Sequence, residues 1–133
     1  MTDLNNAGSA GHFFAFRLFP GEDLLEGIRK AVRSECLRAG FVAAAVGSLY
    51  SACLRYAGKP DGTILEGCFE TVSLSGTVEE GGEHLHASLS DPEGSVVGGH
   101  VMEGCIVRTT MEIILGELSE LRFSREHCPS STY

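Results

Sequence analysis

Apolar and polar residues alternate in strand-like patterns along most of this chain, and a single segment follows the spacing of a helix. Residues 12–19 mix Phe with small residues before Pro20-Gly21, which predicts a strand ended by a turn. Glu22 and Asp23 place acids at the positive end of a helix dipole and favour a helix start, and Gly40 is predicted to cap its end. Apolar positions at a roughly helical spacing support this helix: Leu24, Ile28, Ala31, Val32 and Cys36.

After the helix, the pattern predicts one strand after another, separated by Gly-rich or Pro-containing turns. The predicted strands are 41–46, 49–56, 67–74, the two arms of a hairpin around residue 92, 105–118 and a short last one at 121–123. The 17 glycines fit turns and bulges in a strongly curved sheet. We therefore expect an α+β fold in which a curved, mostly antiparallel sheet packs with one main helix.

The length of 133 residues fits one domain, which we place at 12–125 between a disordered tail at 1–11 and a loose tail at 126–133. The net charge of −8 opposes contact with phosphates, and no run of basic residues offsets it. Direct DNA binding by this chain alone is therefore not expected.

Cysteine usage predicts a reducing compartment. The chain has five cysteines and no C-x-x-C pair, and the sequence shows neither a secretory signal nor an apolar stretch long enough to span a membrane. We expect reduced thiols in a cytoplasmic or nuclear protein, with each cysteine acting as a small buried apolar residue. The cysteines are Cys36, Cys53, Cys68, Cys105 and Cys128.

The most informative segment runs from residue 83 to residue 100 and contains three histidines. His84 and His86 share one face of a strand because strand side chains alternate with a period of two. Asp91-Pro92-Glu93-Gly94 suits a type I turn followed by a left-handed Gly, which makes a hairpin loop with a bulge. In that loop Asp91 pairs with Ser95.

This register places His86 opposite His100 and His84 opposite Met102, so all three imidazoles share one face. Three His ligands without Cys are typical of a catalytic zinc site with a position left open for water or a small-molecule ligand. We therefore predict a metal site of His84, His86 and His100 that holds zinc or another divalent transition metal. The alternative is separate surface or core histidines, the interpretation we give to His12 and His127.

A nearby carboxylate could be a fourth ligand or a general base, and Glu112 is the first candidate. Its strand neighbours are apolar, where an unpaired carboxylate is costly. The alternative is an exposed Glu112 or one paired to Arg17 or Arg108. Glu70 and Glu83 are weaker candidates, and no phosphate loop or dinucleotide fingerprint is present.

Five ordered blocks of sequence resemble the PPC (plants and prokaryotes conserved) domain, also called DUF296 or the PD1-like DNA-binding domain. They are 16–18 with 20–24, 47–49, 69–76, 84–90 with Gly94 and 98–100, and 109–112. The resemblance covers about residues 12 to 125 and implies a PPC/AF0104-like fold assembled as a homotrimer. It also implies that members which keep the histidines can hold a metal there.

Plant members of the family attach the domain to DNA-binding AT-hooks and typically lose these histidines. This chain departs from that pattern because it keeps the histidines and has no Arg-Gly-Arg-Pro core. Residues 67–72 match the region that plant members use for partner contact, although this segment also reads as a core strand. The same broad fold is similar to that of acetolactate decarboxylase and of a zinc-dependent ester hydrolase.

Two classes of function follow from these observations. The first is a metal-binding homotrimer with hydrolase or lyase-like chemistry on a small molecule. The second is a non-enzymatic regulatory module that binds DNA or partner proteins. The retained histidines favour the first class, and a basic patch or an AT-hook would have favoured the second.

Overall fold

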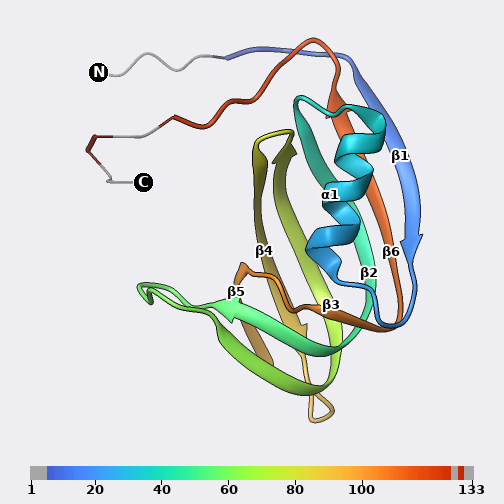
Figure 1. The fold of residues 1–133 in the computed structure, drawn as a ribbon, viewed down its shortest axis with the longest axis vertical. Helices are drawn as coiled ribbons and strands as arrows, with labels where there is room; N and C mark the ends of the chain where they lie inside the picture. The colour runs from blue at the N-terminus through green and yellow to red at the C-terminus, as the bar shows by residue number, and fades with distance from the viewer. Residues whose placement is uncertain (1–5, 127–128, 131–133) are drawn as a thin grey trace.

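The computed structural model describes residues 6–126 and 129–130. Six antiparallel strands form one sheet in the order β1-β6-β2-β3-β4-β5, with a single helix packed on it (Figure 1). The α+β prediction with one main helix is thus confirmed. The elements are β1 (Gly11–Leu18), α1 (Leu24–Glu35), β2 (Gly40–Arg55), β3 (Thr63–Glu79), β4 (Gly82–Ser90), β5 (Val96–Val101) and β6 (Ile106–Leu118).

The sheet is so strongly curved that its edge strand β5 reaches β2, a strand in the middle of the sheet. β5 pairs with β4 and also with the end of β2, through Leu54–Val101 and Arg55–His100. Strands β2, β3, β4 and β5 therefore close on themselves at this end. Irregularities along β2, between Val42 and Ala44 and again between Gly47 and Leu49, increase the bend. Figure 1 shows β2 and β3 curving together away from the helix toward the turn that joins them.

Helix α1 covers one face of the sheet and supplies much of the core. Asp23 caps its start, where the side chain accepts a hydrogen bond of 3.1 Å from the Glu26 amide. The buried helix residues are Leu24, Leu25, Ile28 and Val32, and they join sheet residues such as Leu85, Leu89, Val107, Met111 and Leu115 in one cluster. The sheet face away from α1, called the outer face below, carries the exposed side chains of these strands.

The helix ends four residues before the position predicted from Gly40. Cys36 adopts the left-handed conformation with φ 53°, and its amide donates to the Arg33 carbonyl at 3.3 Å. The Leu37 amide donates to the Val32 carbonyl at 3.0 Å, which completes a Schellman cap. Leu37 is fully buried, so core packing turns the chain inward here. The predicted strand at 121–123 is also wrong, because these residues form no strand.

The unusual cap predicts that Cys36→Gly stabilises the protein by about 1 kcal/mol, because a left-handed residue with a Cβ costs about that much. Urea unfolding followed by circular dichroism would measure the change. Cys36→Ala is the control, since it removes the thiol but keeps the strained Cβ. An equal gain in both variants would show that the thiol, and not the backbone conformation, is responsible.

The cysteines differ more in burial than predicted. Cys105 is buried and Cys53 partly buried, but Cys36 and Cys68 are exposed, so the expectation of buried thiols was wrong for these two. Burial raises the pKa of the Cys105 thiol to about 11. Cys128, like His127, lies outside the described residues. The described cysteines form no disulfide.

Candidate metal centre

The hairpin that carries the histidines has the predicted loop. The Asp91 amide donates to the Ser95 carbonyl at 2.9 Å, and the Gly94 amide donates to the Asp91 carbonyl at 2.9 Å. Gly94 has the expected positive φ of 81°. The Asp91 carboxylate also accepts hydrogen bonds of 2.9 Å from the Glu93 and Ser95 amides, which fixes the turn.

This loop sets the predicted register, in which His86 lies directly opposite His100. His84 does not lie opposite Met102, because β5 ends at Val101 and the Met102 amide instead donates to the Cys53 carbonyl at 3.0 Å. The chain turns toward β2 at this point. His84 still shares the outer face with the other two histidines, so this error in the register leaves the cluster intact.

The three imidazoles converge. Their ring centroids are 5.1 Å apart for His84–His86, 5.5 Å for His84–His100 and 5.8 Å for His86–His100. One ring nitrogen from each lies within 4.8 Å of the others. Burial, and then the positive charge of Arg55, lowers the pKa of His100. This shift favours the neutral imidazole, the form that binds a metal.

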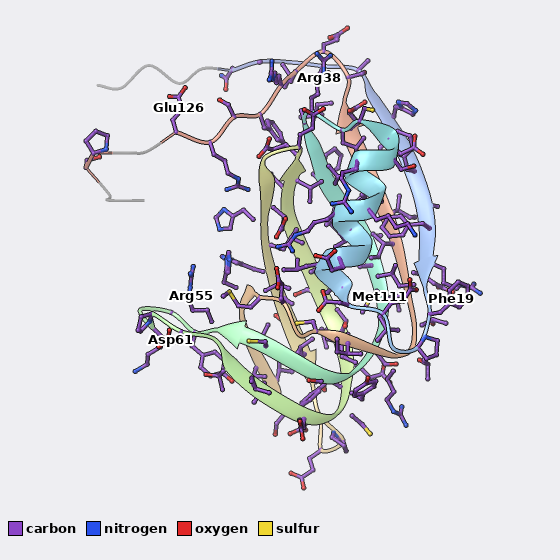
Figure 2. All side chains as sticks on the ribbon, viewed as in Figure 1. Phe19, Arg38, Arg55, Asp61, Met111 and Glu126 are labelled. Carbon is purple, nitrogen blue, oxygen red and sulfur yellow. The ribbon has the colours of Figure 1, made fainter. Side chains whose placement is uncertain are left out.

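Cross-strand pairing places a polar row across the outer face at this site. Ser75 on β3 pairs with His86 on β4, His86 pairs with His100 on β5, and His100 pairs with Arg55 on β2. Figure 2 shows Arg55 where β2 leaves the body of the sheet, on the opposite side from Phe19 and Met111. A cavity of about 1000 Å³ opens over this row, and its wall also includes Tyr56, Lys59, Ser73, Ser88 and Arg125.

Glycines let the strands of the site approach one another closely. A Cβ at Gly99 would lie 2.8 Å from the Arg55 carbonyl oxygen, and one at Gly98 would lie 3.0 Å from the Ala87 carbonyl oxygen. On β3, a Cβ at Gly76 would overlap the carbonyl oxygen of His84. Gly98 and Gly99 precede His100 in the sequence, and all three glycines fall within the blocks that resemble the PPC domain.

Glu112 does not reach the histidines within one chain. It lies on β6, and its Oε1 accepts a hydrogen bond of 2.9 Å from Nη2 of Arg17, directly across from it on β1. Strands β2 and β3 separate β6 from β4. About half of each side chain of this pair is exposed, 54% for Arg17 and 50% for Glu112. The structure thus shows the alternative pairing with Arg17, and within one chain Glu112 does not line the cavity over these histidines.

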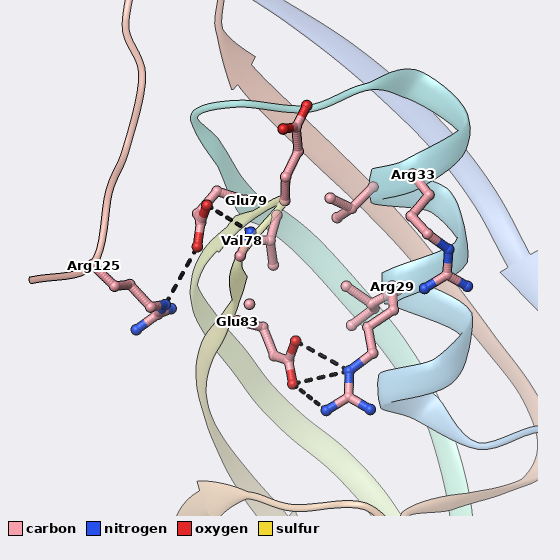
Figure 3. A pocket seen from close by; sticks show the side chains of 11 residues that line it. Arg29, Arg33, Val78, Glu79, Glu83 and Arg125 are labelled. Carbon is pink, nitrogen blue, oxygen red and sulfur yellow. Dashed lines mark hydrogen bonds and ion pairs between the residues drawn. The ribbon is translucent and has the colours of Figure 1, made fainter.

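Glu83, next to His84, is held by the helix instead. Its Oε1 lies 2.6 Å from Nη2 of Arg29, and Nε of Arg29 also donates to both carboxylate oxygens (Figure 3). Only 14% of the Glu83 side chain is exposed. The hydrogen bonds that Arg29 donates to Glu83 and then to Glu103 raise the pKa of Arg29, which keeps its charge. The pair fixes the start of β4 and turns this carboxylate toward α1.

Glu70, the other weaker candidate, is exposed on β3, pairs with Ser48 and Ser90, and does not line the histidine cavity. Among the described residues, no carboxylate or thiolate joins the group of three histidines. The donor set that the fold assembles is therefore three imidazole nitrogens. Three protein ligands on a tetrahedral ion leave the fourth coordination position open for water or another small ligand.

A model of the Plants and Prokaryotes Conserved (PCC) domain matches residues 5–119. The chain belongs to this family. The match confirms the resemblance that the five blocks of sequence indicated under the name PPC. The match begins before residue 12, and in the structure the Ala10 carbonyl accepts a hydrogen bond of 3.0 Å from the amide of Ser119, the residue that follows β6.

Two relatives show this PCC domain as part of longer proteins. The bifunctional protein GlmU of Synechococcus sp. (strain JA-2-3B'a(2-13)) is 42% identical over 120 residues, which cover 90% of this chain and 19% of GlmU. The AT-hook motif nuclear-localized protein 10 of Arabidopsis thaliana is 34% identical over 125 residues, which cover 85% of this chain and 35% of that protein. The chain thus spans about a fifth to a third of these relatives.

Solved structures share the fold of this PCC domain. A hypothetical protein from Salmonella cholerae-suis superposes with a TM-score of 0.95 at 46% identity, covering 97% of this chain and 94% of that one. A PPC protein from Pyrococcus horikoshii gives 0.77 at 28%, covering 98% and 94%. The metal-containing protein AF0104 from Archaeoglobus fulgidus gives 0.76 at 24%, covering 99% and 96%.

A structure from Bacteroides thetaiotaomicron that is described as a candidate DNA-binding protein also superposes on this PCC domain. Its TM-score is 0.76 at 15% identity, and the match covers 96% of this chain and 95% of that one. At this identity the similarity establishes the fold alone. No helix in the described part of the chain has the length and apolar character needed to cross a membrane.

Proposed function

We propose that this PCC domain binds one divalent transition metal ion, most simply zinc, through His84, His86 and His100. The observation that carries the proposal is the convergence of three imidazole nitrogens within 4.8 Å. Zinc is commonly bound by such nitrogens, and a set of three protein ligands is typical of sites with an open position. The description of AF0104, which has the same fold, as metal-containing supports this assignment.

We further propose hydrolase or lyase-like chemistry on a small molecule at this site. When bound, the ion would lower the pKa of a coordinated water to about 7 and polarise a carbonyl group. The chain would contribute the walls around it. Ser75 and Ser88 present hydroxyls that can orient a polar substrate, and the cavity of about 1000 Å³ has room for one.

Elemental analysis of untagged protein tests the metal proposal. We expect about one equivalent of metal per subunit in the wild type and a large loss in His86→Ala and His100→Ala. His12→Ala is the matched control, because His12 is an exposed histidine outside the cluster. Equal metal content in the wild type and all three variants would reject the assignment.

A non-enzymatic regulatory or partner-binding module is the second candidate, and the AT-hook relative in Arabidopsis thaliana favours it. The net charge of −8 argues against direct DNA contact, because affinity for duplex DNA needs several Lys or Arg contacts on one face. We expect no submicromolar binding of random or AT-rich duplexes at physiological salt, as measured by fluorescence anisotropy. Tight, salt-dependent binding would place the regulatory function first.

We also propose that the domain assembles as a homotrimer, as the family resemblance implies. An apolar region on the outer face of β1, β2 and β6 supports self-association, because exposed apolar patches commonly mark protein interfaces. Val46 is 60% exposed and Ile114 41% exposed, and the exposed Ala15 and Ala44 pair with Ile114 on either side. Light scattering should give a trimer for the wild type and smaller species for Val46→Asp. A wild type that is monomeric at micromolar concentration would reject the trimer.

A further inference from the structure

The cavity over the histidines has the opposite charge character from the rest of the protein. The chain carries a net charge of −8, yet among the described residues three cationic side chains and one acid line this cavity. The cations are Arg55, Lys59 and Arg125, and the acid is Glu83. The Glu83 carboxylate is turned toward α1, where it pairs with Arg29, and it forms no ion pair with the cations of the cavity wall. The cavity is thus locally basic on an acidic protein.

Arg55 is the best placed of these cations. It lies directly opposite His100 in the β2–β5 pairing, so its side chain leaves the sheet beside that imidazole. It is partly buried, and it forms no ion pair with any residue that the structure describes. A partly buried guanidinium without an acidic partner is costly unless a ligand supplies the negative charge.

The other two cations differ from Arg55 in their surroundings. Lys59 is exposed in the turn after β2 and has no ion-pair partner among the described residues either. Arg125 reaches the cavity from the C-terminal segment, with Nε 3.4 Å from Oε1 of Glu79 (Figure 3). Because Glu79 neutralises Arg125, the uncompensated positive charge of the cavity comes from Arg55 and Lys59.

Neutral hydrogen-bond donors complete this wall. The hydroxyl groups of Ser73, Ser75 and Ser88 border the same cavity. Gly98 and Gly99 also line it and add no side chains, so space remains between the histidines and Arg55. A group of hydroxyls and free cations around an open volume is suited to an oxyanion, and it offers little to a neutral apolar molecule.

We propose that this cavity binds a small molecule bearing a carboxylate or phosphate group, and that Arg55 donates hydrogen bonds to that group beside the histidine cluster. The inference deepens the proposed metal function, since it gives the substrate class of the same site. A guanidinium matches the two oxygens of a carboxylate or phosphate with two parallel hydrogen bonds. Lys59, which is exposed and screened by solvent, contributes less and acts mainly through its charge.

Isothermal titration calorimetry with succinate and with inorganic phosphate tests this proposal, on both zinc-loaded and metal-free protein. We expect Arg55→Gln to weaken anion binding by about 10- to 100-fold, the usual loss for a charge-assisted contact. Lys59→Glu should weaken it less, and because this residue is exposed in a turn, the variant keeps the fold. The matched control is Arg108→Gln, which removes the same charge from an exposed site outside the cavity and should bind anions as the wild type does.

Three results would overturn the anion site. The first is equal affinity of the wild type, Arg55→Gln and Lys59→Glu for both anions, and the second is no binding by the wild type. The third is binding of neutral succinamide as tightly as succinate. Metal content of the same samples separates this proposal from the metal proposal. Absence of metal from the wild type would reject only the metal proposal. The anion proposal would still be tested by the effect of Arg55→Gln on the anion affinity of metal-free protein.

Discussion

Zinc is expected to raise the melting temperature of the metal-free protein by about 10 °C when its free concentration is about 100 times its dissociation constant. A ligand that binds only the folded state at this excess adds about 2.7 kcal/mol of stability. For a chain of this size, each kcal/mol moves the melting temperature by about 4 °C. The ligand nitrogens sit on two paired strands, so binding in the unfolded chain is expected to be much weaker. Differential scanning fluorimetry with and without zinc measures the shift.

His100→Ala should lose most of this shift, because two imidazoles on one strand cannot complete the site. His12→Ala should keep it, because this exposed histidine lies on β1, away from the cluster. A chelator should reverse the effect in the wild type. A similar zinc shift in His100→Ala and the wild type would show that zinc stabilises the protein elsewhere.

The zinc shift should also depend on pH in a defined direction. Metal binding needs neutral imidazoles, so protons compete with the ion as the pH falls. Burial and Arg55 lower the pKa of His100, so this ligand stays neutral below the pH of about 6.5 at which an ordinary histidine is half protonated. For a group with a lowered folded pKa, the stabilisation is present above the unfolded pKa and is lost as the pH falls. The zinc shift is therefore expected in full at pH 8 and reduced on approach to pH 5.

The histidine site could be predicted from sequence because its geometry is local. Asp91, Pro92 and Gly94 determine a loop of one type, and that loop fixes which residues face one another across the hairpin. Alternation along the strands then brings the imidazoles to one face. No knowledge of the rest of the sheet is needed for this step, which is why the register of His86 and His100 was correct.

The surroundings of the site could not be predicted in this way, because they depend on distant strand pairing. Arg55 is 45 positions before His100 in the sequence, and only the return of β5 to β2 brings them together. The same limit applies to Glu112, because its pairing with Arg17 and its distance from the histidines both depend on strand order. The end of the helix was misplaced because burial of Leu37 outweighed the preference for a glycine cap.

Gly76 is the glycine whose replacement should damage the site most. It pairs with Leu85 across β3 and β4 and has φ 140°, a conformation that residues with a side chain rarely adopt. An added Cβ would overlap the His84 carbonyl oxygen and lie 3.0 Å from the Leu85 Cα. These are backbone atoms, so no side chain can rotate away, and relief requires β4 to move off β3.

Gly76→Ala is therefore expected to destabilise the protein by about 3–5 kcal/mol, from backbone strain and overpacking together. The control is Gly58→Ala, because Gly58 also has positive φ, 74°, but a Cβ there meets nothing within 4 Å; it should cost only about 1 kcal/mol. Urea unfolding measures both. Since movement of β4 displaces His84 and Leu85 together, Gly76→Ala should also weaken zinc binding, whereas Gly58→Ala should leave it unchanged. If the two variants lost equal stability, β4 would be able to shift without cost. The close contact between β3 and β4 would then not determine the position of His84.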